Sequence, residues 1–140
     1  MTQRPTPVLR GEERAYFDRA RERELVYQRC RTCDATQWYP RVVCIRCSGT
    51  DLELTAASGN GTIHSFTTLY RAGHPSRAAD VPYTMVLVDL VEGVRVFGEL
   101  VDVPPAAARI GLPVEVGFQD VTDDLTLPVF RPKGGAIDAR

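Results

Sequence analysis

The segments CRTC at residues 30–33 and CIRC at residues 44–47 contain all four cysteines of this 140-residue chain, with ten residues between them. This spacing is typical of a zinc ribbon, because each Cys-x-x-Cys turn supplies two thiolates and the four together complete a tetrahedron around Zn²⁺. The predicted metal ligands are Cys30, Cys33, Cys44 and Cys47. Four protein ligands leave no open position for water or substrate, so the Zn²⁺ is expected to be structural and not catalytic.

Two disulfides or a redox dithiol are the alternatives for these cysteines. Disulfides need an oxidising compartment, and the N-terminal residues lack the apolar core of a signal peptide. We therefore expect a cytoplasmic protein. A redox Cys-x-x-Cys usually stands alone in a βαβ unit, which two tandem pairs do not fit. Arg29, Arg31 and Arg46 lie beside the cysteines, and we expect these cations to favour the thiolate form.

The composition is that of a globular protein with an uneven charge distribution. Hydrophobic residues make up 44% of the chain, and no apolar stretch has the length of a membrane span. Residues 1–50 carry a net charge of +4 and residues 51–140 a net charge of −5. This division indicates two modules that meet near residue 50. The charge balance is not that of a typical nucleic-acid binder.

The sequence pattern predicts four segments. We expect an N-terminal arm and helix at residues 1–24, the zinc ribbon at residues 25–55, a β-barrel at residues 56–131 and a flexible tail at residues 132–140. The fold class is therefore mainly β, with one N-terminal helix.

The helix and the ribbon both carry aromatic side chains. Tyr16 and Phe17 lie on the apolar face of the predicted helix, which could either cap the core of this chain or dock on another subunit. Trp38 and Tyr39 stand between the two cysteine pairs, where an aromatic pair is expected to pack over the metal site or to face a partner. The predicted partner interface consists of Tyr16, Phe17, Trp38, Tyr39 and Arg41.

The C-terminal half has the pattern of five strands with a short helical segment between the third and the fourth. The predicted strands are residues 62–70, 83–91, 94–101, 113–121 and 125–130, with the helical turns at residues 104–109. This order of elements favours a five-stranded OB-fold barrel. Pro128 suggests that the last strand is an edge strand.

A twelve-residue loop, residues 71–82, connects the first two barrel strands, and loops of this length are often functional. Arg71, His74 and Arg77 could contact phosphate or carboxylate groups. The alternative is a solvated loop whose charges bind nothing. His64, on the first strand, could be catalytic, but a partly buried strand histidine is the simpler interpretation because no nucleophile is placed beside it. The sequence contains no recognised phosphate-binding or hydrolase motif, so we expect no self-contained active site.

Several short motifs recur in one known family. They are the N-terminal helix, the two cysteine pairs, YPR at residues 39–41, SGNGTI at residues 58–63, VPY at residues 81–83 and LVEG at residues 90–93. In this order they resemble the acyl-CoA-associated zinc-ribbon/OB-fold family, a long-standing domain of unknown function. The resemblance extends from about Gly11 to Phe130. Asp34 and Ile45 depart from the Gly and Pro that the family often carries in its cysteine turns.

The resemblance implies a small non-catalytic subunit that forms a hetero-oligomer with a thiolase or a thiolase-like aldolase of steroid side-chain degradation. Such a subunit would complete the channel for the acyl-CoA substrate, with Arg71, His74 and Arg77 close to the CoA or acyl group. The first alternative is a single-stranded nucleic-acid-binding protein, because zinc ribbons and OB barrels both serve that role. The second is an independent acyl-CoA enzyme that uses His64 or His74.

Overall fold

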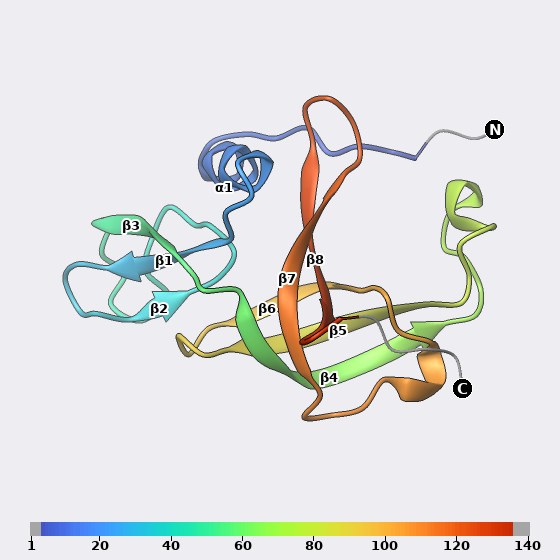
Figure 1. The fold of residues 1–140 in the computed structure, drawn as a ribbon. Coiled ribbons are helices and arrows are strands. Elements are labelled where there is room, and N and C mark those ends of the chain that lie inside the picture. Colours follow the sequence, from blue (N-terminus) through green and yellow to red (C-terminus); the bar gives the residue numbers. More distant parts are fainter. Residues whose placement is uncertain (1–3, 136–140) are drawn as a thin grey trace.

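The computed structural model describes residues 4–135, which form a helix, a small three-stranded sheet and a barrel (Figure 1). The outermost residues of the predicted arm and tail, 1–3 and 136–140, lie outside the described range. Within that range, no helix has the length and apolar character needed to cross a bilayer.

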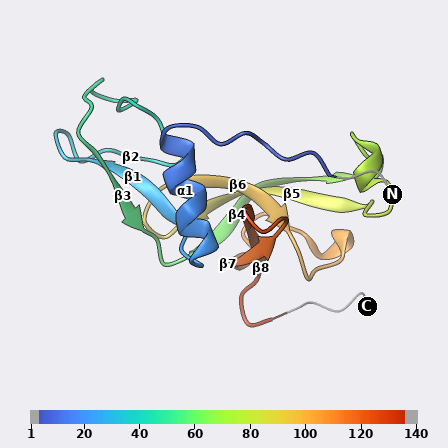
Figure 2. The same cartoon turned by 90° about the horizontal axis from the view of Figure 1, so that it is seen from above.

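Helix α1 (Glu12–Arg21) has two glutamates in its first turn and two arginines in its last turn, so these charges interact favourably with the helix dipole. Tyr16 and Ala20, four residues apart, are buried on one face. The helix lies beside the ribbon strands and the ends of β7 (Pro113–Asp120) and β8 (Thr126–Pro132) (Figures 1 and 2). It therefore caps the core of this chain.

The ribbon sheet has the strand order β2-β1-β3 and contains β1 (Val26–Cys30), β2 (Thr36–Gln37) and β3 (Leu52–Ala56). Both pairings are antiparallel, and β1 is central. The short strand β2 pairs back on β1.

The barrel contains β4 (Asn60–Leu69), β5 (Tyr83–Leu90), β6 (Arg95–Leu100), β7 (Pro113–Asp120) and β8 (Thr126–Pro132). These five strands close in the order β4-β5-β6-β8-β7, and the predicted helical turns appear as the short 3₁₀ helix η2 (Pro105–Ala107). The OB-fold prediction is thus confirmed.

Strand β8 is not the edge strand that Pro128 suggested. It pairs with β7 along seven residues, and Leu100 and Phe130 join it in parallel to β6. The Phe130 ring is fully buried against Gly98, where an added Cβ would lie 3.1 Å from the ring. The barrel closes because a glycine leaves room for an aromatic ring at this junction.

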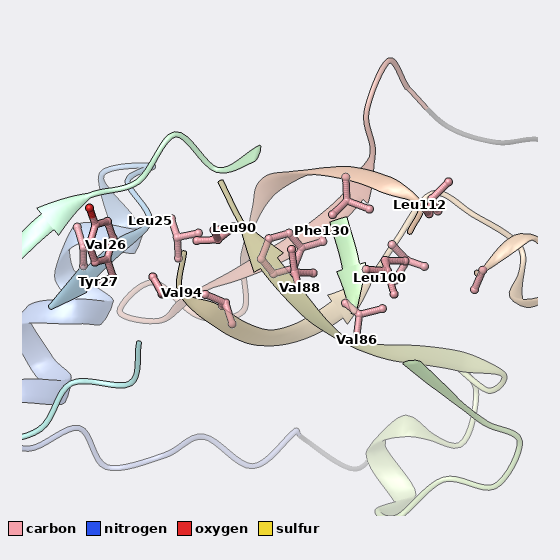
Figure 3. Close-up of a cluster of buried hydrophobic side chains, with 14 of the residues drawn as sticks. Leu25, Val26, Tyr27, Val86, Val88, Leu90, Val94, Leu100, Leu112 and Phe130 are labelled. Atoms are coloured by element: carbon pink, nitrogen blue, oxygen red, sulfur yellow. The ribbon is translucent and has the colours of Figure 1, made fainter. Parts of the chain in front are cut away.

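One apolar core joins the two modules. Val88 and Phe130 lie in the barrel, Leu90 and Val94 at its near end, and Leu25 at the base of the ribbon, all buried in the same cluster (Figure 3). A bidentate ion pair between Arg23 and Asp120, with nitrogen–oxygen distances of 2.8 and 2.7 Å, adds a second link between the helix end and the barrel. The ribbon and the barrel therefore pack against each other as parts of one structure.

Candidate functional site

The four cysteine side chains converge in the ribbon. Their sulfur atoms all lie within 4.8 Å of one another. The Sγ atoms of Cys30 and Cys47 are 3.6 Å apart, and those of Cys33 and Cys44 are 3.7 Å apart. Tetrahedral Zn²⁺ with zinc–sulfur bonds of about 2.3 Å would place its ligands about 3.8 Å apart. The donor set and its spacing therefore fit a metal site that is closed to a fifth ligand.

Each cysteine turn is closed by a residue in the left-handed backbone region. Asp34 follows the first pair with φ 62° and donates its N–H to the Cys30 carbonyl at 2.9 Å. Ser48 follows the second pair with φ 62° and donates to the Cys44 carbonyl at 3.0 Å. Aspartate tolerates this conformation better than most residues, which explains how Asp34 replaces the glycine common at this position.

Backbone N–H groups prepare two of the thiols for ionisation. The pKa of the Cys44 thiol falls to about 6, mainly because the N–H groups of Cys47 and Arg46 point at its sulfur. The pKa of Cys30 is also lowered, chiefly by the N–H of Cys33. For Cys47 the Gly49 N–H acts in the same direction, but the sulfur of Cys30 and burial outweigh it, and the pKa rises to about 11. Four thiolates therefore need a cation between them.

Two of the three arginines near the cysteines, Arg29 and Arg31, are paired with carboxylates, whereas Arg46 acts on Cys44 through its backbone N–H. Arg29 forms ion pairs with Asp34 and Glu53, and Arg31 forms ion pairs with Asp51 and Glu53. These carboxylates neutralise the guanidinium groups. The ion pairs join the first cysteine turn to β3 and its preceding loop, whereas the thiolate form is favoured by backbone N–H groups.

The aromatic residues of the ribbon pack on the helix. The rings of Tyr16 and Trp38 are 6.4 Å apart, those of Tyr16 and Tyr39 6.2 Å, and Trp38 Nε1 donates to the Tyr16 hydroxyl at 3.0 Å. Tyr39 donates to a carboxylate oxygen of Glu13 at 3.2 Å. The pair thus rests on α1, with Tyr16 and Phe17, and its packing over the metal site stays a prediction.

Tyr16 itself is not available to a partner. Its side chain is 3% exposed, and burial raises its pKa to about 12 although the hydrogen bond from Trp38 acts against this shift. The prediction that Tyr16 contacts another subunit is therefore wrong for this side chain. Its role is to hold Trp38 and Phe17 in place, since the Tyr16 and Phe17 rings are 5.0 Å apart in an edge-to-face arrangement.

An apolar pocket of about 240 Å³ lies where the helix, the ribbon and the barrel meet. Its walls come from α1, from the residues after β2, and from β5, β6 and β8. The lining residues are Arg4, Tyr16, Phe17, Trp38, Tyr39, Arg77, Met85, Phe97, Gly98, Glu99, Leu127, Pro128 and Val129. Four of the five residues predicted for a partner interface therefore meet at this pocket, and Arg41 does not line it.

The three loop residues predicted near a substrate have different surroundings. Arg77, with a side chain 14% exposed, lines the pocket and pairs with Glu99 at 2.8 Å and Asp80 at 2.9 Å, while its guanidinium lies 4.0 Å from the centre of the Tyr83 ring. His74 caps the 3₁₀ helix η1 (Pro75–Arg77) by accepting the N–H of Ser76 at 3.1 Å. Neither His74 nor Arg71 lines the pocket, so the structure does not bring the three together.

Eight of the thirteen lining residues were absent from the predicted site residues, among them the large apolar residues Met85 and Phe97. Both occupy outward positions of strands whose alternate residues, such as Val86 and Val96, are buried. A large apolar side chain at an outward strand position was the available signal, because such a position normally carries a polar residue.

Comparisons with known proteins point to one family. Residues 17–53 match the family described as "ChsH2, rubredoxin-like zinc ribbon domain", and residues 54–119 match "ChsH2, C-terminal OB-fold domain". A chain of a solved structure described as "Ltp2-ChsH2(DUF35) aldolase" is 35% identical, with a TM-score of 0.82, over 91% of this chain and 98% of that chain.

Curated relatives differ in length. A "DUF35 domain-containing scaffold protein" of Methanothermobacter thermautotrophicus is 31% identical over 71% of this chain and 75% of its own length. A "Probable enoyl-CoA hydratase alpha subunit" of Thermomonospora curvata is 36% identical over 92% of this chain, but this chain spans only 40% of that relative. The similarity thus covers the ribbon and barrel, not the whole of the hydratase subunit.

Proposed function

The chain belongs to the ChsH2/DUF35 family of zinc-ribbon and OB-fold proteins, and on this premise we propose that it is a non-catalytic accessory subunit of a thiolase-fold enzyme. The partner would be a thiolase or a steroid side-chain aldolase, and the complex a hetero-oligomer. The observation that carries the proposal is the likeness of nearly the whole chain to a chain of the Ltp2-ChsH2(DUF35) aldolase.

The metal would be Zn²⁺ in a structural role. Its four ligands would be Cys30, Cys33, Cys44 and Cys47, whose sulfur spacing suits a closed tetrahedral site. Strand β1 ends in Cys30, so the metal would hold the central strand of the small ribbon sheet to the loop that carries Cys44 and Cys47. A three-stranded sheet of this size needs such support because its own apolar core is small.

The residues best placed for acid–base chemistry do not form a complete site. His64 Nδ1 lies 3.4 Å from Asp89 Oδ2 and 3.2 Å from a guanidinium nitrogen of Arg95. All three side chains are exposed or half-exposed on the outside of the barrel. The four cysteines belong to the metal site in the other module. This distribution supports an accessory role in which the partner supplies the catalytic groups.

The finer part of the proposal is that the apolar pocket forms one wall of the partner's acyl-CoA channel. Phe17, Trp38, Met85 and Phe97 would contact the acyl group. Arg77 is already neutralised by Glu99, so it would shape the end of the pocket and not act as a free charge for a CoA phosphate. The predominantly apolar walls of the pocket suit a hydrocarbon ring or chain.

The complex can be tested by reconstitution. We expect the chain to be inactive alone, and the thiolase-like enzyme from the same organism to gain activity or thermal stability when the chain is added. Thioester turnover by the isolated chain, or full activity and stability of the isolated enzyme, would refute the accessory role. A salt-dependent shift of single-stranded oligonucleotides would favour the nucleic-acid alternative.

The channel role needs a second measurement. Phe97 is half-exposed at the pocket, and Phe97→Ser should lower kcat/KM of the complex for a bulky acyl-CoA by about tenfold, because a hydrophobic contact of this kind contributes about 1–3 kcal/mol. The rate with a short acyl-CoA should change much less. An equal loss for both substrates would argue against a channel wall at this position. Ile110→Ser, at an exposed residue outside the pocket, is the matched control.

A further inference from the structure

The loop between the two cysteine pairs ends in an exposed apolar surface. We call residues 41–46 the ribbon tip. Val42, Val43 and Ile45 are between 45% and 65% exposed and fall within a stretch of four residues. Arg41 and Arg46 flank them, and neither guanidinium forms an ion pair or hydrogen bond within residues 4–135. Isolated exposed aliphatic residues are common, but three in one short loop are typical of an interaction site.

Two buried glutamines hold the backbone of this loop. Gln28 accepts the N–H of Arg41 at 2.9 Å and donates to the carbonyl of the same residue at 2.9 Å. Gln37 accepts the N–H of Ile45 at 2.9 Å and donates to the Val43 carbonyl at 3.2 Å. Gln37 also donates to Gln28 at 2.8 Å, and both side chains are buried.

This network gives the ribbon tip a defined shape before any partner binds. Each amide uses both its donor and its acceptor on backbone groups or on the other amide, so the pair is well satisfied although it is buried. A loop that is already ordered loses less conformational entropy on binding. The apolar side chains are directed to solvent while their backbone is held from inside, which is the arrangement expected of a rigid docking loop.

We propose that the ribbon tip docks into an apolar pocket with a carboxylate-bearing rim on the thiolase-like partner. This inference rests on the proposed accessory function and names the surface that would perform it. Charge selects the partner, because Arg41 and Arg46 are unpaired in the described chain whereas Arg29 and Arg31 are neutralised by neighbouring carboxylates. Arginine beside a small apolar patch is the composition of binding hot spots.

The position of the tip agrees with the rest of the proposal. The ribbon lies at one end of the molecule (Figure 2). No residue of the ribbon tip lines the apolar pocket, so docking through the tip leaves that pocket open to a substrate. A membrane is a less suitable target, since the tip contains no aromatic residue of the kind found at bilayer interfaces, and its two arginines are fewer than the roughly four to eight basic residues that anionic-lipid sites carry.

Two tip variants test the inference, with affinity for the thiolase-like enzyme of the same organism as the readout. The apolar variant replaces Val42, Val43 and Ile45 by serine and should weaken binding by at least about 30-fold, the effect of losing a hot spot. The charge variant, Arg41→Glu with Arg46→Glu, retains the apolar side chains and should weaken binding and reduce its dependence on salt. Zinc content and circular dichroism identify any variant that has not folded.

The control variant carries Val91→Ser and Ile110→Ser, at two exposed aliphatic residues of the barrel, and should bind as the wild-type chain does. If the wild-type chain binds and both tip variants bind equally well, the tip inference is overturned while the accessory function stands. If the wild-type chain does not bind the enzyme, both are overturned.

Two further measurements identify a different occupant. Wild-type chain can be mixed with vesicles of phosphatidylcholine and phosphatidylserine, and its mass in solution can be measured without the enzyme. Binding to the vesicles that the tip variants abolish would replace the enzyme by a membrane. Self-association that the tip variants abolish would replace it by a second copy of this chain. Either result overturns the proposal.

Discussion

Replacement of Tyr16 by phenylalanine should change stability in opposite directions at neutral and at high pH. At pH 8 the variant leaves the indole N–H of Trp38 without its acceptor, which lies at 3.0 Å in the wild-type chain. Loss of a partly buried hydrogen bond of this kind costs about 1 kcal/mol. The variant should therefore be less stable than wild type by about that amount.

At high pH the phenol of Tyr16 makes the folded wild-type chain less stable. Its pKa is about 12 in the folded chain, against an ordinary value of 10.0, and burial is the main cause. Because the folded-state pKa is raised, the stabilisation is fully present below pH 10 and is lost as pH rises through 12. The two-unit shift corresponds to a total loss of about 2.7 kcal/mol, of which about 1.4 kcal/mol is lost by pH 11. The phenylalanine variant does not suffer this loss.

Urea unfolding followed by circular dichroism, with metal-loaded protein from pH 8 to pH 11, measures both effects. The unfolding free energy of the Tyr16→Phe variant should begin below that of wild type and equal or exceed it at pH 11. A difference between the two proteins that stays constant over this range would refute the reasoning, since it would mean that the buried phenol does not titrate with folding. Tyr70→Phe, at an exposed tyrosine, should match wild type throughout.

Three further predictions concern the metal site, the barrel and the acid limit of stability. Cys44→Ser should lower the bound zinc from one ion per chain to almost none, as zinc analysis would measure. It should also abolish hydrogen-exchange protection in the ribbon strands while the central barrel strands remain protected, as exchange measurements would show. Gly61→Ala should destabilise the chain by about 3 kcal/mol, because the new Cβ would lie 2.5 Å from the Asp89 carbonyl oxygen. In the control variant Gly73→Ala the new Cβ meets no atom within 4 Å, so the unfolding midpoint should not change. Asp120→Asn should reduce the loss of stability on acidification. Hydrogen bonds from Arg23 and Thr126 hold the pKa of the Asp120 carboxyl well below its usual value, so its stabilising effect is present above about pH 4 and is lost as the pH falls below it. An acid-unfolding curve identical to that of wild type would contradict this.

The ribbon and the barrel strands were predictable because their signals are local. Two residues separate the cysteines of each pair, and the alternation of buried valines in β5 and β6 is visible over eight residues or fewer. The five predicted barrel strands agree with β4 to β8 to within two residues at most ends. The closure of the barrel was not visible, because it depends on one parallel contact between Leu100 and Phe130, thirty residues apart.

The candidate pocket could be predicted only in part. The aromatic residues of the helix and the ribbon attracted attention by type, and so did Arg77 by its charge. Their meeting place depends on how α1 packs across β8 and over Met85 and Phe97. The outward positions of these two residues were visible in the strand pattern, but the element that covers them was not. Tyr16 shows the limit clearly, since an apolar helix face has the same pattern whether its own core or a partner covers it.

The spacing of the cysteines and the periodicity of the strands were enough to predict a zinc ribbon followed by five strands in the order of an OB-fold, because ligation geometry and strand alternation depend on neighbours along the chain. The tertiary structure alone decided that Gln28 and Gln37 are buried and hold the ribbon tip, and that Arg41 and Arg46 are unpaired within the described chain while Arg29 and Arg31 are not. A glutamine or an arginine has the same sequence signature in either situation. Burial and charge pairing depend on residues brought together from distant segments, and those contacts arise only when the ribbon, helix and barrel pack.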